Sequence, residues 1–125
     1  ATIAADTDRR YRSAGEVANG REIYVQEGCW YCHTQQVRPI VADVGLGPVS
    51  LVGDHVYESP VLFGVQRIGP DLMHVGARAP TDDAGWVAGY LTDPRSERSY
   101  SIMPSYSHLS EGDLADLAAY IAGSR

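Results

Sequence analysis

The stretch Gly28-Cys29-Trp30-Tyr31-Cys32-His33 decides how this 125-residue chain folds. It holds both cysteines of the chain, two residues apart, and a histidine directly follows the second. Before it, apolar side chains recur at three- and four-residue steps, which predicts a helix from residue 15 to about residue 27. Gly28 stands where helices commonly end on a left-handed residue. The motif is therefore expected on one turn directly after a helix.

Two thiols and an imidazole at this spacing are typical of covalent haem attachment. Cys29 and Cys32 can reach the two vinyl groups at one edge of a porphyrin, and His33 then lies beneath the iron. We predict one covalent haem c, held by both cysteines, with His33 as an iron ligand. Such a cofactor also adds apolar bulk to a chain that has one Phe and two Trp.

Three other interpretations of the Cys-x-x-Cys spacing agree less well with the chain. A thioredoxin-like redox pair belongs at a strand-to-helix turn of an alternating β/α chain, a pattern that this sequence lacks. A structural zinc site needs four ligands, and no second cysteine pair or histidine at finger spacing is present. A disulfide across two residues leaves His33 unexplained. The motif favours haem over all three.

A thioether opposite the imidazole raises the reduction potential of a haem and closes its iron to other ligands. Met103 lies 70 residues after His33, in a short loop before the last predicted helix. We predict that it is the second axial ligand, and that Met73 packs in the core. His74 and His108 stay open as alternative sixth ligands.

Further residues are expected around the haem. The Pro70 carbonyl is predicted to accept the Nδ1–H of His33, because such a bond orients a ligating imidazole. The haem propionates need cations or hydrogen-bond donors. The candidates for that role are Arg38, Tyr57, Arg78, Trp86 and Tyr106.

The rest of the chain predicts one mainly α domain, with short helices and long loops around the haem. Residues 1–14 are expected to be a flexible lead-in, and residues 15–125 the domain. Glycine and proline interrupt residues 34–68, which predicts a long loop insertion with some strand character at 49–56. Further helices are predicted at 81–92, with Thr81 as N-cap, and from Ser110, where Asp113 completes a capping-box spacing.

The terminal helices are expected to clasp each other. Gly20 and Tyr24 in the first helix, with Leu117 and Tyr120 in the last, suit a close crossing in which a glycine admits a neighbouring ring.

Charge excludes some partners. The net charge is −6, and all ten basic residues are arginine, so nucleic acid is not an expected partner.

No run approaches the ~20 apolar residues that span a bilayer, and no signal peptide is visible. The opening Ala1-Thr2-Ile3 lacks an initiator Met, which suggests that a signal peptide or a membrane anchor has been removed.

The order of these motifs closely resembles the mono-haem subunit II of cbb3-type cytochrome c oxidases. The resemblance covers roughly residues 20–106 and includes the long insertion after the haem motif. Besides residues 20–39, it rests on Val52-Gly53-Asp54-His55-Val56-Tyr57-Glu58-Ser59-Pro60, Arg67-Ile68-Gly69-Pro70-Asp71-Leu72, Asp93-Pro94-Arg95 and Met103-Pro104-Ser105-Tyr106.

This resemblance implies a non-enzymatic, membrane-anchored electron relay with His33 and Met103 as axial ligands. Such a subunit feeds the oxidase's catalytic subunit from the periplasmic side of the bacterial inner membrane. Two features depart from the family: its N-terminal transmembrane helix is absent, and the last helix resembles an ordinary class I cytochrome c ending. A stand-alone periplasmic carrier, or a cytochrome domain of another respiratory complex, therefore stays open as an alternative. An open-site haem enzyme or sensor is a further one.

Overall fold

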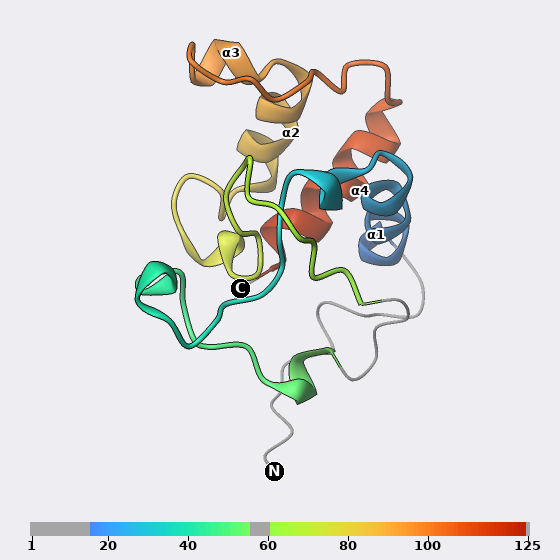
Figure 1. Ribbon diagram of the computed structural model, residues 1–125. Coiled ribbons are helices and arrows are strands. Elements are labelled where there is room, and N and C mark those ends of the chain that lie inside the picture. The colour runs from blue at the N-terminus through green and yellow to red at the C-terminus, as the bar shows by residue number, and fades with distance from the viewer. Residues whose placement is uncertain (1–15, 56–60, 125) are drawn as a thin grey trace.

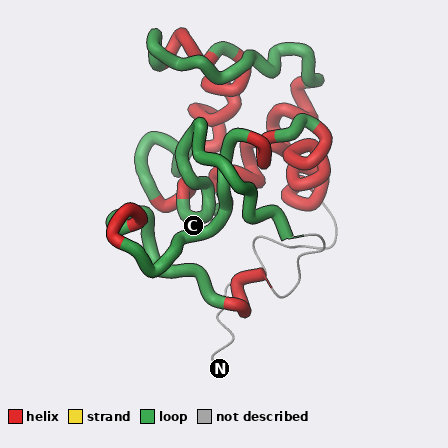
Figure 2. The backbone as a smooth tube through the Cα atoms, in the orientation of Figure 1, coloured by secondary structure: helices red, strands yellow, loops and turns green. Residues whose placement is uncertain are grey.

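Four α-helices and four short 3-10 helices make up the secondary structure of the computed structural model, which describes residues 16–55 and 61–124 (Figure 1). Loops join these helices, and no strand occurs within the described ranges (Figure 2). The prediction of a mainly α fold of short helices and long loops is confirmed. The flexible lead-in predicted for residues 1–14 lies outside the described residues. The α-helices are α1 (Glu16–Gln26), α2 (Ala84–Thr92), α3 (Pro94–Glu97) and α4 (Glu111–Ala122), and the 3-10 helices are η1 (Cys29–Tyr31), η2 (Val41–Asp43), η3 (Val52–His55) and η4 (Val75–Ala77).

The crossing of α1 and α4 forms the centre of the core, as predicted. A Cβ atom on Gly20 would lie 2.7 Å from the Cβ of Tyr120, so only glycine lets the two helices approach this closely. Beside it, the rings of Tyr24 and Tyr120 pack with their centroids 5.4 Å apart. Both tyrosines and Leu117 are almost completely buried.

Helix α2 packs against α4 and closes the other side of the core with Val87 and Leu91. Its predicted N-cap was wrong. Asp83 caps the helix by accepting a hydrogen bond from the Gly85 amide at 2.9 Å. The Thr81 hydroxyl instead donates to the carbonyls of Val75 at 2.6 Å and Arg78 at 3.0 Å, so it is not available to cap the helix.

Helix α4 begins as the sequence predicted. The Ser110 hydroxyl accepts a hydrogen bond from the Asp113 amide at 3.2 Å. At the other end of the helix the Gly76 amide of η4 donates to the Ser124 carbonyl at 2.6 Å, which ties the C-terminal end to the middle of the chain. No helix of the described ranges is long and apolar enough to cross a membrane.

The insertion that begins at residue 34 runs away from the helices (Figure 1). Its described part forms the turns η2 and η3, and the strand character expected at 49–56 is absent from residues 49–55. Several of its apolar side chains stay in solvent: Val41 is 89% exposed and Val52 is 88% exposed. This segment therefore adds surface more than it adds core.

Candidate functional site

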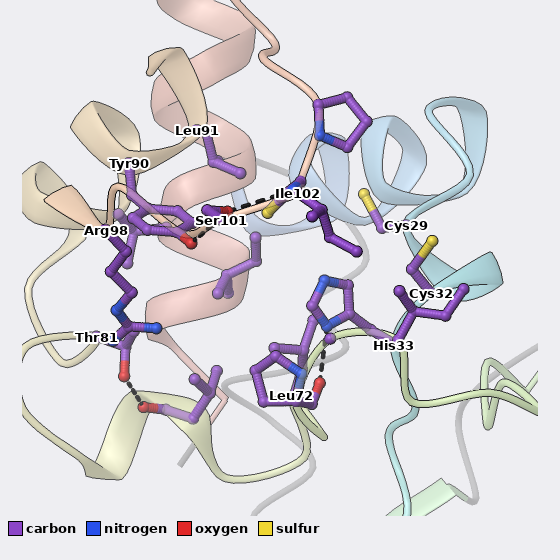
Figure 3. Close-up of a pocket in the computed structure, with 18 of the residues that line it drawn as sticks. Cys29, Cys32, His33, Leu72, Thr81, Tyr90, Leu91, Arg98, Ser101 and Ile102 are labelled. Carbon is purple, nitrogen blue, oxygen red and sulfur yellow. Dashed lines mark hydrogen bonds between the residues drawn. The ribbon is translucent and has the colours of Figure 1, made fainter. Parts of the chain in front are cut away.

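A cavity of about 310 Å³ lies between the cysteine motif, helix α2 and the loop that follows α3 (Figure 3). Most of the side chains that line it are apolar. It brings together six of the residues predicted from the sequence, which come from separate segments of the chain. They are Cys29, Cys32, His33, Pro70, Trp86 and Met103.

The cysteine motif forms one tight turn directly after α1. Gly28 ends the helix with φ 71°, as predicted, and the turn η1 follows at once. The Cys29 carbonyl accepts hydrogen bonds from the amides of Cys32 at 3.2 Å and His33 at 3.1 Å. This turn places both sulfur atoms and the imidazole on the cavity.

The imidazole of His33 is fixed from the side opposite the cysteines. Its Nδ1 lies 2.7 Å from the Pro70 carbonyl oxygen, the bond that the sequence predicted. Gly69 lies against the ring, since a Cβ atom there would come within 2.8 Å of both ring nitrogens. With Nδ1–H donating to Pro70, Nε2 is the nitrogen left to bind a ligand in the cavity.

Burial sets the protonation of these groups. It lowers the pKa of His33 below its usual range, against the opposing effects of the Pro70 carbonyl and Asp71. A neutral imidazole is the form that binds a metal ion. Burial also raises the pKa of the Cys29 thiol to about 12, with the nearby charge of Glu27 adding to the rise.

The alternative interpretations of the cysteine pair find little support in this geometry. Reactive cysteines of redox enzymes have depressed pKa values, whereas the pKa of Cys29 is raised. A zinc site needs four ligands, and the described residues contain no group of three or more His, Cys, Asp or Glu side chains placed to hold a metal ion.

The loop that carries Met103 is held over the cavity by its backbone. Arg95 donates from Nη1 to the Met103 carbonyl at 3.1 Å, and the Ser101 hydroxyl accepts from the Met103 amide at 3.3 Å. Farther along, the Tyr106 amide donates to the Leu91 carbonyl of α2 at 2.8 Å. The Met103 side chain is half-buried and lines the cavity.

The other candidate iron ligands lie elsewhere. Met73 is buried to 3% exposure and does not line the cavity. His74 contacts the Pro48 carbonyl at 3.2 Å, and His108 pairs with Glu27 at 2.7 Å. Among the described residues that line the cavity, Met103 is therefore the sulfur donor besides the two cysteines.

Most of the residues predicted to meet the propionates lie outside the cavity. Arg38 forms a two-pronged pair with Asp43, at 2.9 and 3.0 Å, on the insertion. Arg78 donates to the Asp71 carbonyl at 3.4 Å. Neither arginine lines the cavity, and neither does Tyr106. Tyr57 lies outside the described residues, so Trp86 is the one member of this group that faces the cavity.

Sequence reasoning missed a network that joins the insertion to the His33 side of the cavity. Arg67 contacts Asp43 at 2.6 Å and the hydroxyl of Thr34 at 2.7 Å. Asp71, the residue after Pro70, accepts from the same hydroxyl at 2.6 Å. The side chain of Asp43 is fully buried. Arg67 and Arg38 together hold the pKa of its carboxyl group well below its usual range. No short sequence motif predicts such a network, because the residues that form it lie up to 37 positions apart in the chain.

A second residue that the sequence did not single out is Arg98. It lines the cavity beside Trp86 and Tyr90, and the spacing of arginines along the chain gives no sign of this placement.

The residues of the cavity fit a haem. The thiols lie at one side of it, and an imidazole with Nε2 available is held beneath them (Figure 3). A thioether joins the lining from the Met103 loop, and the remaining walls are largely apolar. A Cβ at Gly69 would displace the imidazole, so this glycine keeps the ring in its place.

Comparison with known proteins agrees with this chemistry. The model of a family described as "Cytochrome C oxidase, mono-heme subunit/FixO" matches residues 6–122, which is nearly the whole chain. No curated protein matches the chain.

Proposed function

The chain belongs to the FixO family of mono-haem cytochrome c oxidase subunits, and we propose that it transfers single electrons through a haem iron bound by His33 and Met103. Membership of this family gives the chain one haem c and makes it a subunit of an oxidase complex. The axial ligands and the path of the electron go beyond the family match.

The observation that carries the proposal is the convergence of an imidazole and a thioether on one cavity. His33 and Met103 come from opposite ends of the domain sequence, and both line it. Pro70 fixes the imidazole at 2.7 Å, while Arg95 and Ser101 fix the backbone of Met103. A bound haem supplies an iron that changes between two oxidation states without making or breaking bonds. Ligands that are held this firmly suit such a centre.

The two cysteines anchor the group. Cys29 and Cys32 would hold a haem by adding across its two vinyl groups, each addition forming a carbon–sulfur bond while the thiol hydrogen would pass to the neighbouring vinyl carbon. Nothing is oxidised or lost in this addition. The short turn between Cys29 and Cys32, closed by the 3.2 Å hydrogen bond from Cys32 to Cys29, sets the spacing of the two sulfur atoms.

We infer that the subunit is an electron relay without bond-making chemistry of its own. Two protein ligands leave no iron position for a substrate, in contrast to haem sites that activate oxygen. Its partners in this role are the catalytic subunit of the oxidase and the cytochrome or other redox protein that donates the electron.

Carbon monoxide binding to the reduced holoprotein tests the closed iron. The wild type should exclude the ligand, and Met103→Ala should bind it, since the substitution removes the sulfur. Met73→Ala is the matched control, because this buried methionine does not line the cavity. Ready binding by the wild type, or by Met73→Ala but not Met103→Ala, would overturn the proposed ligand pair and point to an open-site haem protein.

We place the protein on the periplasmic side of the bacterial inner membrane, anchored or soluble. The resemblance of its motifs to the cbb3 subunit supports this placement. Protease treatment of intact spheroplasts that express the full gene should digest the haem domain, whereas digestion only after lysis would contradict it.

A further inference from the structure

The cavity holds one permanently charged side chain among the described residues that line it. Arg98 faces it, together with the titratable groups of Tyr24, Cys29, Cys32, His33, Tyr90 and Tyr100, and no lining residue is an aspartate or glutamate. An arginine keeps its charge at any ordinary pH. A cation in a largely apolar wall therefore needs a partner that the wall does not supply.

The position of Arg98 is set by two aromatic rings. Its guanidinium carbon lies 5.6 Å from the centroid of the Trp86 ring and 5.5 Å from that of Tyr90. The two rings stack at 5.2 Å, and the Tyr90 hydroxyl donates to Ser101 at 3.0 Å. Contacts of this kind favour a guanidinium over the faces of aromatic rings. They leave its hydrogen-bond donors available to another group.

No carboxylate of the described residues pairs with Arg98. This separates it from the two arginines of the network on the His33 side. Arg38 and Arg67 are both engaged with Asp43. Arg98 is half-buried, so water satisfies its donors only in part.

Arg98 and the cysteines lie at opposite sides of the cavity (Figure 3). A haem has its two vinyl groups toward one edge and its two propionates toward the other. When the vinyl groups meet the thiols, the carboxylates are directed to the far side. The far side is where Arg98, Tyr90 and Thr81 are drawn.

We propose that Arg98 binds the carboxylate of a haem propionate and holds it ionised, with Trp86 and Tyr90 positioning the guanidinium. This inference rests on the proposed haem site, but it does not depend on which side chain is the second axial ligand. It assigns to Arg98 the role that sequence reasoning gave to Arg38 and Arg78. A planar guanidinium suits the task, because its fork of donors matches the two oxygens of a carboxylate.

The pH dependence of the haem reduction potential tests the proposal. An ionised propionate stabilises the oxidised iron, so the potential falls as the pH rises through the propionate pKa. A nearby guanidinium lowers that pKa. Arg98→Gln should therefore shift the inflection to higher pH, by about one unit or more. Loss of the cation should also lower the potential, and this decrease should be smallest between the two inflections, where the propionate is protonated only in the variant.

Arg98→Lys and Arg38→Gln complete the experiment. The lysine variant keeps a charge but loses the fork and the ring stacking, so the inflection should shift in the same direction by a smaller amount. If Arg98→Gln does not retain haem, the lysine variant decides alone. Arg38→Gln should leave the inflection where it is, since Arg38 pairs with Asp43 outside the cavity.

An unmoved inflection in the Arg98 variants overturns the proposal, as does a shift caused by Arg38→Gln instead. A merely structural role for Arg98 would lower stability without moving the inflection. Failure of the His33 and Met103 pair would appear separately, as carbon monoxide binding to the wild type.

Discussion

The contact between Gly69 and His33 shows how strongly single residues determine this site. The glycine amide donates to the Cys32 carbonyl at 2.9 Å, so the segment that carries Pro70 runs directly against the cysteine motif. The imidazole fills the space that a side chain on Gly69 would need. One backbone segment thus both orients the ring through the Pro70 carbonyl and makes room for it.

Gly69→Ala is expected to displace the imidazole. Its Cβ would lie 2.8 Å from Nδ1 and Nε2, and crowding of this kind typically costs roughly 1–3 kcal/mol. We expect a lower free energy of unfolding and a lower yield of holoprotein, read from denaturant titration and from the haem absorbance per chain.

Gly89→Ala in α2 is the control for this prediction, since a Cβ there meets nothing within 4 Å. It should be neutral or stabilise by about 0.5–1 kcal/mol, because alanine is the better helix former. Equal losses in both variants would show that the contact with His33 is not the cause.

At the scale of single residues, the sequence could predict side chains that one local motif brings together and the hydrogen-bond partner of one of them. Cys29, Cys32 and His33 lie on one turn, and the partner of His33 was identified from the chemistry of ligating imidazoles. The sequence did not predict which arginine faces the cavity. No local pattern distinguishes Arg38 from Arg98, and only the folded structure shows that Arg38 pairs with Asp43 while Arg98 lies over the ring of Trp86.

At the scale of secondary-structure elements, the packing of α1 against α4 is the main source of the domain's buried core. Gly20→Ala should force these helices apart, because the new Cβ would lie 2.7 Å from the Cβ of Tyr120 and also meet the Asp116 carbonyl. We expect a loss of roughly 1–3 kcal/mol in the free energy of unfolding, measured by denaturant titration.

Gly112→Ala on α4 is the matched control, since a Cβ at this position meets nothing within 4 Å. It should leave stability unchanged or slightly raised. A Gly20→Ala variant as stable as the control would mean that the helices can separate without cost.

The network around Asp43 makes the insertion sensitive to acid. Arg67 and Arg38 hold the pKa of the Asp43 carboxyl group far below its usual value of about 4. A carboxylate with a depressed pKa stabilises the fold fully above its unfolded pKa. That stabilisation declines as the pH falls below about 4.

We therefore expect the free energy of unfolding of the wild type to fall as the pH is lowered from about 5 to about 3. Asp43→Asn should be less stable at neutral pH and should lose less on acidification, because its amide does not titrate. Denaturant titrations at a series of pH values measure both curves. Parallel curves for the two proteins would contradict the role given to Asp43.

The helix ends were predictable because they depend on local sequence patterns. The path of the insertion was not predictable from such patterns. The periodicity before Gly28 and the spacing from Ser110 to Asp113 gave the ends of α1 and the start of α4 within a residue or two. The start of α2 was misplaced at Thr81, since both Thr81 and Asp83 are good caps and the turn between them depends on contacts with Val75 and Arg78. The path of residues 34–55 depends on the long-range contacts of Arg67, which no local pattern encodes.

At the scale of the whole molecule, net charge predicts how fast the protein reacts with redox reagents of either charge. With a net charge of −6, to which propionates add, the chain attracts cations over long distances. A cationic metal complex should therefore oxidise the reduced holoprotein faster than an anionic complex of similar driving force.

This preference should weaken when the ionic strength rises from about 0.01 M to about 0.15 M, because the screening length shortens from about 30 Å to about 8 Å. Stopped-flow traces with the two reagents measure it. Rates that are equal at low salt, or a preference that salt leaves unchanged, would show that net charge does not govern encounter.

In the part of the chain that the structure describes, a small set of helices encloses the cavity, and the insertion extends from this set. The set depends on the α1 and α4 crossing, and the cavity collects its residues from five separate stretches of chain. This arrangement explains why a chain of 125 residues with few aromatic core residues still encloses a site of defined chemistry.

The near-infrared absorption spectrum of the oxidised holoprotein tests the central claim most directly, because methionine–ferric haem c has a weak band in that region. We expect the band in the wild type and in Met73→Ala, and its loss in Met103→Ala. A wild type without the band and with a high-spin ferric spectrum would contradict the proposed pair of His33 and Met103.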